Sequence, residues 1–75
     1  MSQFMIRRDD NQGRSFAHVV NFLIAHEITS YADANPIFKA FHLKREDVVV
    51  DIPDALDEVF ISALKAVKIR VQKSG

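Results

Sequence analysis

Apolar residues between positions 15 and 28 recur at the spacing of a helix, and Ser15 is a favourable N-cap at its start. The apolar positions are Phe16, Val19, Val20, Phe22, Leu23, Ile24 and Ile28. They leave only a narrow stripe of polar or small residues. A helix that is apolar almost all round is buried on more than one side. We therefore expect this helix at the centre of the domain, or with one face against a second copy or a partner.

Two further helices are predicted downstream. The first spans residues 35–43, where Asn35 followed by Pro36 is a favoured helix start and Ile37 and Phe41 share a face. The second spans residues 53–72 and opens on Pro53. Its apolar residues, at spacings of three and four, are Leu56, Val59, Phe60, Ala63, Leu64 and Val67. Acidic residues at its start and basic residues at its end complement the helix dipole.

Three segments allow more than one interpretation. Residues 45–51 form a fourth short helix or, because Val48, Val49 and Val50 are all β-branched, a strand. Residues 68–72 continue the last helix or, by the minority interpretation, form a strand that pairs with residues 4–6. Residues 4–6 are themselves a short strand, an arm docked on a neighbour or a disordered terminus.

The pattern as a whole predicts an all-α fold of three or four helices. The part before residue 15 is expected to be a flexible N-terminal arm (residues 1–14), because residues 8–14 are wholly polar apart from one glycine. Residues 15–75 are expected to form a single helical domain.

Size and composition narrow the class of protein. A chain of 75 residues has one small core and is marginally stable alone, so we expect a homodimer. The absence of cysteine excludes disulfides and cysteine-based zinc sites, and it suits a reducing compartment. No apolar run approaches the roughly 18 residues needed to cross a bilayer. We therefore expect a cytoplasmic protein that does not act at a membrane.

The charges balance at ten basic and ten acidic residues. Nucleic-acid binders usually carry a basic excess, because phosphate contacts supply most of their nonspecific affinity. The balance therefore favours a protein partner, although a nucleic-acid partner stays open.

A helix-turn-helix motif is one candidate site, formed by residues 36–51 with its turn near Leu43. The fit is loose, since Phe38 stands where a small residue is usual and His42 where glycine is usual. In this alternative, the residues that contact nucleic acid are Lys39, Lys44 and Arg45. Acidic residues in the same segment would repel phosphates.

An uneven charge distribution is a second candidate. Between positions 46 and 58 the chain carries six acidic residues and no basic one: Glu46, Asp47, Asp51, Asp54, Asp57 and Glu58. Four basic residues and no acidic one follow. We interpret the six acids as an acidic face that binds a partner, because such a dipole steers association with a charged surface. Ordinary solvated surface and helix capping explain each acid singly.

The six phenylalanines are a third candidate. Most must be core residues, since aromatic side chains bury the largest areas. Where exposed, Phe4, Phe22 and Phe41 are the best aromatic anchors for a partner, because a few aromatic residues dominate the energy of an interface.

Catalytic, metal and cofactor sites are not expected. His18, His26 and His42 lack the spacing of a zinc site, no serine has a glycine-flanked elbow, and no glycine-rich phosphate loop exists. The sequence therefore predicts a small non-enzymatic regulator or inhibitor that docks on a partner protein. The alternatives are a helix-turn-helix DNA-binding regulator and a self-assembling accessory protein.

Overall fold

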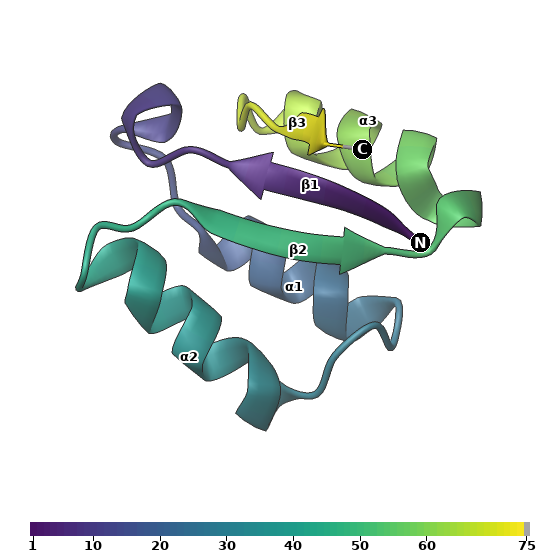
Figure 1. Ribbon diagram of the computed structural model, residues 1–75, viewed down its shortest axis with the longest axis horizontal. Coiled ribbons are helices and arrows are strands. Elements are labelled where there is room, and N and C mark those ends of the chain that lie inside the picture. Colours follow the sequence, from purple (N-terminus) through teal and green to yellow (C-terminus); the bar gives the residue numbers. More distant parts are fainter. Residues whose placement is uncertain (75) are drawn as a thin grey trace.

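The protein folds as three helices packed on one face of a three-stranded antiparallel sheet, in a computed structural model that describes residues 1–74 (Figure 1). The expected all-α fold is therefore wrong. In chain order the elements are β1 (Ser2–Ile6), the 3-10 turn η1 (Asp9–Asn11), α1 (Ala17–Ala25), α2 (Tyr31–His42), β2 (Val48–Ile52), the 3-10 turn η2 (Asp54–Leu56), α3 (Asp57–Ala66) and β3 (Gln72–Ser74).

The first strand, β1, is the centre of the sheet, whose strand order is β2-β1-β3. Phe4 lies opposite Val50 on one side and opposite Lys73 on the other. The expected N-terminal arm thus contains the central strand, and of the alternatives for residues 4–6 the strand is confirmed. A C-terminal strand does pair with β1, as the minority interpretation has it, but it spans Gln72–Ser74 and not residues 68–72, and its partners are residues 3–5.

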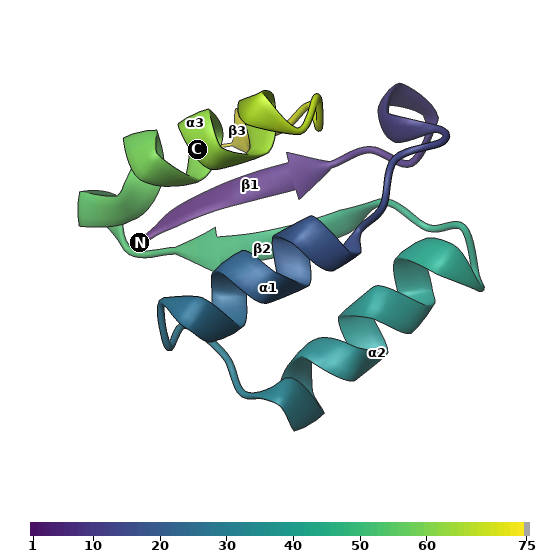
Figure 2. The same ribbon diagram turned by 180° about the vertical axis from the view of Figure 1, so that it is seen from behind.

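The sheet has one buried and one open face. Ser2, Phe4 and Ile6 are buried along β1, and the residues between them are more exposed. β2 shows the same alternation, as expected for a sheet covered on one side. Figure 2 shows α1 crossing the covered face, with α2 beside it and α3 above β1.

Of the two alternatives for residues 45–51, the strand is confirmed, as β2 (Val48–Ile52). Its three consecutive valines favour extended backbone, and Ile52 precedes a proline, which disfavours helical backbone. The second helix of a helix-turn-helix is therefore missing, and the helix-turn-helix hypothesis fails because α2 is followed by a strand.

Aromatic contacts hold the helices to the sheet. The ring of Phe60 lies 5.0 Å from that of Phe4 and 5.1 Å from that of Phe22, measured between centroids. Phe16 stacks on Phe41 at 4.4 Å. Phe4, Phe22 and Phe41 are 0%, 8% and 1% exposed. These three phenylalanines were candidate anchors only if exposed. All three are core residues, so they do not form a docking surface.

The helix α1 is central, as its pattern indicates, since it packs against both α2 and α3. Its buried residues are Val19, Val20, Phe22 and Leu23. The central position of α1 explains its wide apolar surface without a second copy of the chain. The small size of the chain is then the one remaining argument for a homodimer, which stays a prediction.

The helix α2 starts four residues before the position expected from Asn35 and Pro36. Ser30 is its N-cap, and the Ser30 side chain accepts a hydrogen bond from the Asp33 N–H at 3.2 Å. Pro36 lies inside the helix. A proline there removes one hydrogen bond of the helix, and the side chain of Pro36 is exposed.

None of the three α-helices ends on a glycine, and α1 and α3 end in the same way. The N–H of Ile28 donates to the Leu23 carbonyl at 2.9 Å, and the N–H of Ile69 donates to the Leu64 carbonyl at 2.9 Å. These bonds are typical of the Schellman cap, whose left-handed position is usually glycine. Here Glu27 (φ 57°) and Lys68 (φ 63°) occupy it. The last helix therefore ends at Ala66, well short of residue 72.

Replacing Glu27 with glycine tests this account of the helix ends. Glu27→Gly should raise the free energy of unfolding by about 1 kcal/mol, because the left-handed conformation costs a residue with a Cβ atom roughly that much. The melting temperature should rise by about 4–8 °C in a thermal unfolding scan. The matched change Glu58→Gly, in the first turn of α3, should lower it. A decrease for Glu27→Gly would contradict the account.

Candidate functional site

Three loops meet at one end of the sheet. Because β1 runs antiparallel to both neighbours, the end of β1 lies beside the starts of β2 and β3. The loops of residues 7–16, 43–47 and 67–71 therefore share this end (the left side of Figure 1). We call it the basic end. Its basic residues are Arg7, Arg8, Arg14, Lys44, Arg45, Lys68 and Arg70, against the acidic residues Asp9, Asp10, Glu46 and Asp47.

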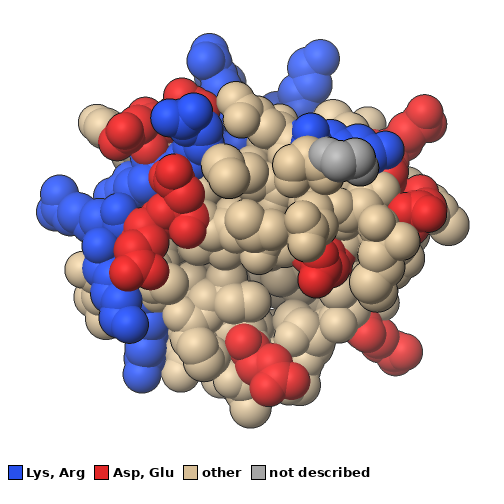
Figure 3. Space-filling view, viewed as in Figure 1, with Lys and Arg blue, Asp and Glu red and all other residues tan. Residues whose placement is uncertain are grey.

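Figure 3 shows this segregation on the face of the open sheet. Basic side chains gather along the left side and at the top, with some acidic ones among them. Acidic side chains predominate on the right and below, and uncharged surface lies between. The net charge of zero therefore conceals a dipole along the sheet.

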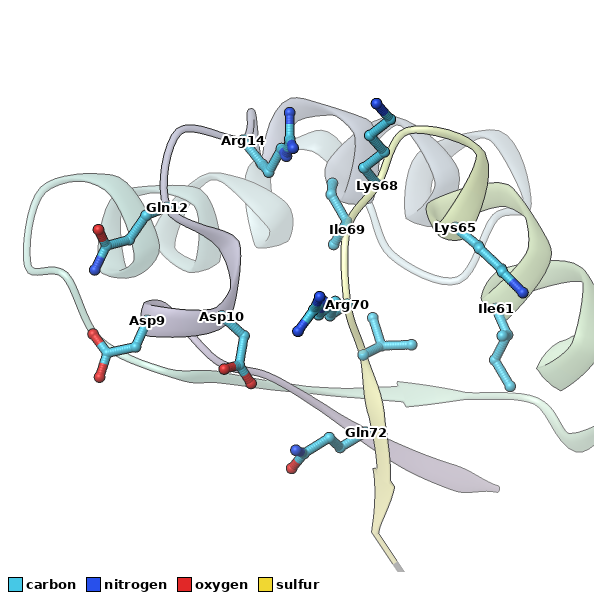
Figure 4. A pocket seen from close by; sticks show the side chains of 11 residues that line it. Asp9, Asp10, Gln12, Arg14, Ile61, Lys65, Lys68, Ile69, Arg70 and Gln72 are labelled. Carbon is cyan, nitrogen blue, oxygen red and sulfur yellow. The ribbon is translucent and has the colours of Figure 1, made fainter.

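An open groove lies between the turn at residues 9–14 and the segment that joins α3 to β3. Its apolar part is formed by Ile61, Ile69 and Val71. Its charged and polar lining residues are Asp9, Asp10, Gln12, Arg14, Lys65, Lys68, Arg70 and Gln72. Figure 4 shows Arg14, Lys68 and Lys65 around one side of it, Arg70 near its centre, and Asp9 and Asp10 opposite Lys65. We call it the basic groove.

The four basic side chains of the groove have no carboxylate partner within 4.0 Å among residues 1–74. The ion pairs found there join Arg7 to Asp10 at 3.9 Å, Lys73 to Asp57 at 2.9 Å, and the N-terminal ammonium to Asp54 at 3.4 Å. Arg14, Lys65, Lys68 and Arg70 are all exposed. Their charges are thus available to an anionic ligand.

The side chain of Asn11 fixes the geometry of the groove. Asn11 is 1% exposed. Its Nδ2 donates to the carbonyls of Arg7 at 2.8 Å and Arg70 at 3.0 Å, and its Oδ1 accepts from the Arg70 N–H at 2.7 Å. This amide takes the place of a strand partner where β1 ends. It therefore ties the turn to the segment before β3.

A second, smaller depression lies on the other side of the turn. Arg8, Asp9, Gln12, Gly13 and Arg45 line it. The Arg8 guanidinium lies 5.1 Å from the centre of the Phe41 ring, a cation–π contact. Basic side chains thus flank the turn at residues 9–13 on both sides.

The six acidic residues expected to form one partner-binding face lie in two groups, one at each end of β2. Glu46 and Asp47 precede β2, and Asp54 follows it, so about 15–20 Å of extended strand separates them. The Asp47 carboxylate accepts from the Arg8 N–H at 2.8 Å. Asp51 lies on the open face of the sheet and Glu58 is exposed on α3.

Asp57 is buried and bound by two other side chains of the protein. Its Oδ2 accepts from the Ser2 hydroxyl at 2.6 Å and pairs with the Lys73 ammonium at 2.9 Å. The hydrogen bond from Ser2, followed by that from Lys73, lowers the pKa of the Asp57 carboxyl below its ordinary value of 3.8. The same pair raises the pKa of Lys73 above 10.5. Asp57 thereby links α3 to β1 and β3.

The residues proposed for nucleic-acid contact are exposed, but the motif that would present them is absent. Lys44 and Arg45 belong to the basic end, and Lys39 lies in the last turn of α2. Sequence reasoning assigned Lys65, Lys68 and Arg70 to helix stability and missed the groove they form with Arg14. The alternation of Val67, Ile69 and Val71 in the sequence argues against a continued helix, and the helix does end at Ala66.

Other sites are weaker. A small apolar depression between α1 and α2 is lined by Ala17, Val20, Asn21, Tyr31, Asn35 and Phe38. Within residues 1–74, no group of three or more histidine, aspartate or glutamate side chains is placed to hold a metal ion. In the same residues, no helix has the length and apolar character needed to cross a membrane.

Comparison with known proteins adds no family: no family model, no curated protein and no solved structure matches this chain.

Removal of the Asn11 amide should destabilise the protein strongly. Asn11→Ala loses three hydrogen bonds and leaves partly buried backbone groups without partners, which should cost roughly 2–4 kcal/mol. Urea unfolding followed by circular dichroism measures the loss. The control is Asn21→Ala, at an exposed position of α1, which should change stability by less than about 0.5 kcal/mol. A loss for Asn11→Ala no larger than that of the control would show that the amide does not hold the turn.

The Asp57 pair should make stability depend on acid pH. Because the pKa of Asp57 is lowered in the folded state, its contribution is fully present above 3.8 and is lost as the pH falls through the folded-state pKa. Asp57→Asn should therefore lower the melting temperature at neutral pH, and the difference from the unchanged protein should shrink below pH 3.8. Glu58→Gln is the matched control and should show no such convergence. A difference that is independent of pH would rule out the ionised pair.

Proposed function

We propose that this protein is a small non-enzymatic regulator or inhibitor that docks on a partner protein, and that the basic end is its docking surface. The observation that carries the proposal is the basic groove, where Arg14, Lys65, Lys68 and Arg70 lie exposed without carboxylate partners. Uncompensated charge of one sign around an open groove attracts a ligand of opposite sign and raises its rate of association.

A protein partner fits this surface better than a nucleic acid. The groove contains no aromatic side chain on which a base could stack. Its apolar residues, Ile61, Ile69 and Val71, suit aliphatic side chains. We propose that the protein acts in the cytoplasm, because disulfides are rare in that reducing compartment and this chain has no cysteine.

A second copy of the chain is the competing occupant, as in the self-assembling alternative. The acidic side of one molecule would meet the basic end of the next. Such a contact uses different surfaces on the two copies, so it extends into open chains unless its geometry closes a ring. Mass measured over a range of concentrations separates this occupant from a foreign partner.

Charge reversal at the groove tests the proposal. The partner is captured from native lysate after nuclease treatment, and the amount recovered is compared between proteins. The double variant Lys65→Glu/Arg70→Glu should recover about tenfold less partner than the unchanged protein, because attraction between opposite charges becomes repulsion. Lys39→Glu, the same change on α2, should retain the partner. Circular dichroism verifies that both variants are folded.

Two results would contradict the proposal. One is recovery of the same proteins in equal amounts by the reversed and unchanged forms, which would move docking away from the groove. The other is loss of all captured material on nuclease treatment, which would assign the basic end to nucleic acid.

A further inference from the structure

The strand β3 is an edge of the sheet. Within residues 1–74 it pairs with β1 on one side and has no strand on the other. Arg70 directs both its N–H and its carbonyl toward the β1 side, where Asn11 binds them. Backbone groups of successive residues in a strand point to opposite sides. The N–H and carbonyl groups of Val71 and Lys73 are therefore directed outward, away from β1.

The basic groove lies along the segment that leads into this edge. Residues 68–72 line it from the strand side, and Ile61 and Lys65 of α3 line it from the side of the helices. Figure 4 shows the segment from Ile69 to Gln72 running through the groove, with the turn at residues 9–14 on one side and α3 on the other. A bound chain lying along the edge would thus meet backbone partners and basic side chains together.

We propose that the basic groove binds an extended acidic segment of a partner protein, which pairs with Val71 and Lys73 as a fourth strand of the sheet. This inference rests on the docking function proposed above and names the chemistry of the partner. Main-chain hydrogen bonds supply affinity in this mode of recognition, and side chains at alternate positions supply specificity. Lys65, Lys68 and Arg70 select carboxylates, and Ile61 accepts an aliphatic side chain between them.

The opposite edge of the sheet does not share these features. β2 contains Asp51 and no basic residue. An acidic peptide would find no positive charge within β2, and Asp51 would repel it. The two edges are chemically distinct, so an acidic segment is directed to β3.

The binding of a defined peptide tests the inference directly. The probe is a capped peptide of about eight residues that alternates glutamate and valine. It is titrated into isotopically labelled protein, with affinity measured from the amide chemical shifts. The largest shifts should fall at Val71, Lys73 and their neighbours. Lys65→Glu/Arg70→Glu should weaken binding by about tenfold or more, while Lys39→Glu should leave it unchanged.

Two methylated peptides distinguish strand addition from simple charge attraction. One carries N-methyl groups on all its glutamates and the other on all its valines. An added strand directs only one of these sets toward β3, so one peptide should bind about tenfold more weakly than the other. Both have the same charge and the same number of methyl groups, and the protein itself is unchanged.

Equal affinity for the two methylated peptides would overturn strand addition, and so would shifts centred on β2. Equal affinity for a single-stranded oligonucleotide of the same charge would overturn selection of an acidic protein segment. A second copy as the occupant would appear as a rise in mass with concentration that the peptide fails to reverse. These failures differ from failure of the docking function, in which charge reversal leaves partner capture intact.

Discussion

The antiparallel pairing of β1 with strands on both sides is the constraint on which the rest of the structure depends. It places the ends of β2 and β3 at defined positions relative to β1. The alternation along β1 then directs Ser2, Phe4 and Ile6 to one face, where the helices cover them. The same pairing gathers three loops at one end, so the basic groove is a consequence of topology as well as of composition.

The two ends of the sheet use their charges differently. At the end where β1 starts, charged groups bind one another, as Asp57 does with Lys73 and Asp54 with the N-terminal ammonium. At the other end, the groove leaves four cations without carboxylate partners among the described residues. A protein of zero net charge therefore carries unpaired positive charge in the groove at one end of its sheet.

Helix positions followed from the sequence because a period of three to four residues is a local signal. The centres of α1, α2 and α3 all lie within the predicted ranges. Their ends did not follow, since Glu27 and Lys68 occupy positions where glycine is the usual signal. The sheet was harder to predict, because a strand such as residues 2–6 is recognised by partners about 50 and 70 residues away. The groove depends on that sheet, and so the sequence pattern alone explains Lys65, Lys68 and Arg70 by the helix dipole.

The position of β1 in the sheet also shapes how the chain folds. The central strand is synthesised before both of its partners, which are β2, starting at Val48, and β3, starting at Gln72. Pairings so distant in sequence are slow to form, because the loop between the strands must be ordered before any contact is gained. Until β3 has been synthesised, the backbone groups along one edge of β1 have no strand to pair with. An unpaired strand edge can associate with other chains. The sheet is therefore completed only after residues 72–74 have left the ribosome, so the pairing of β1 lags well behind its own synthesis.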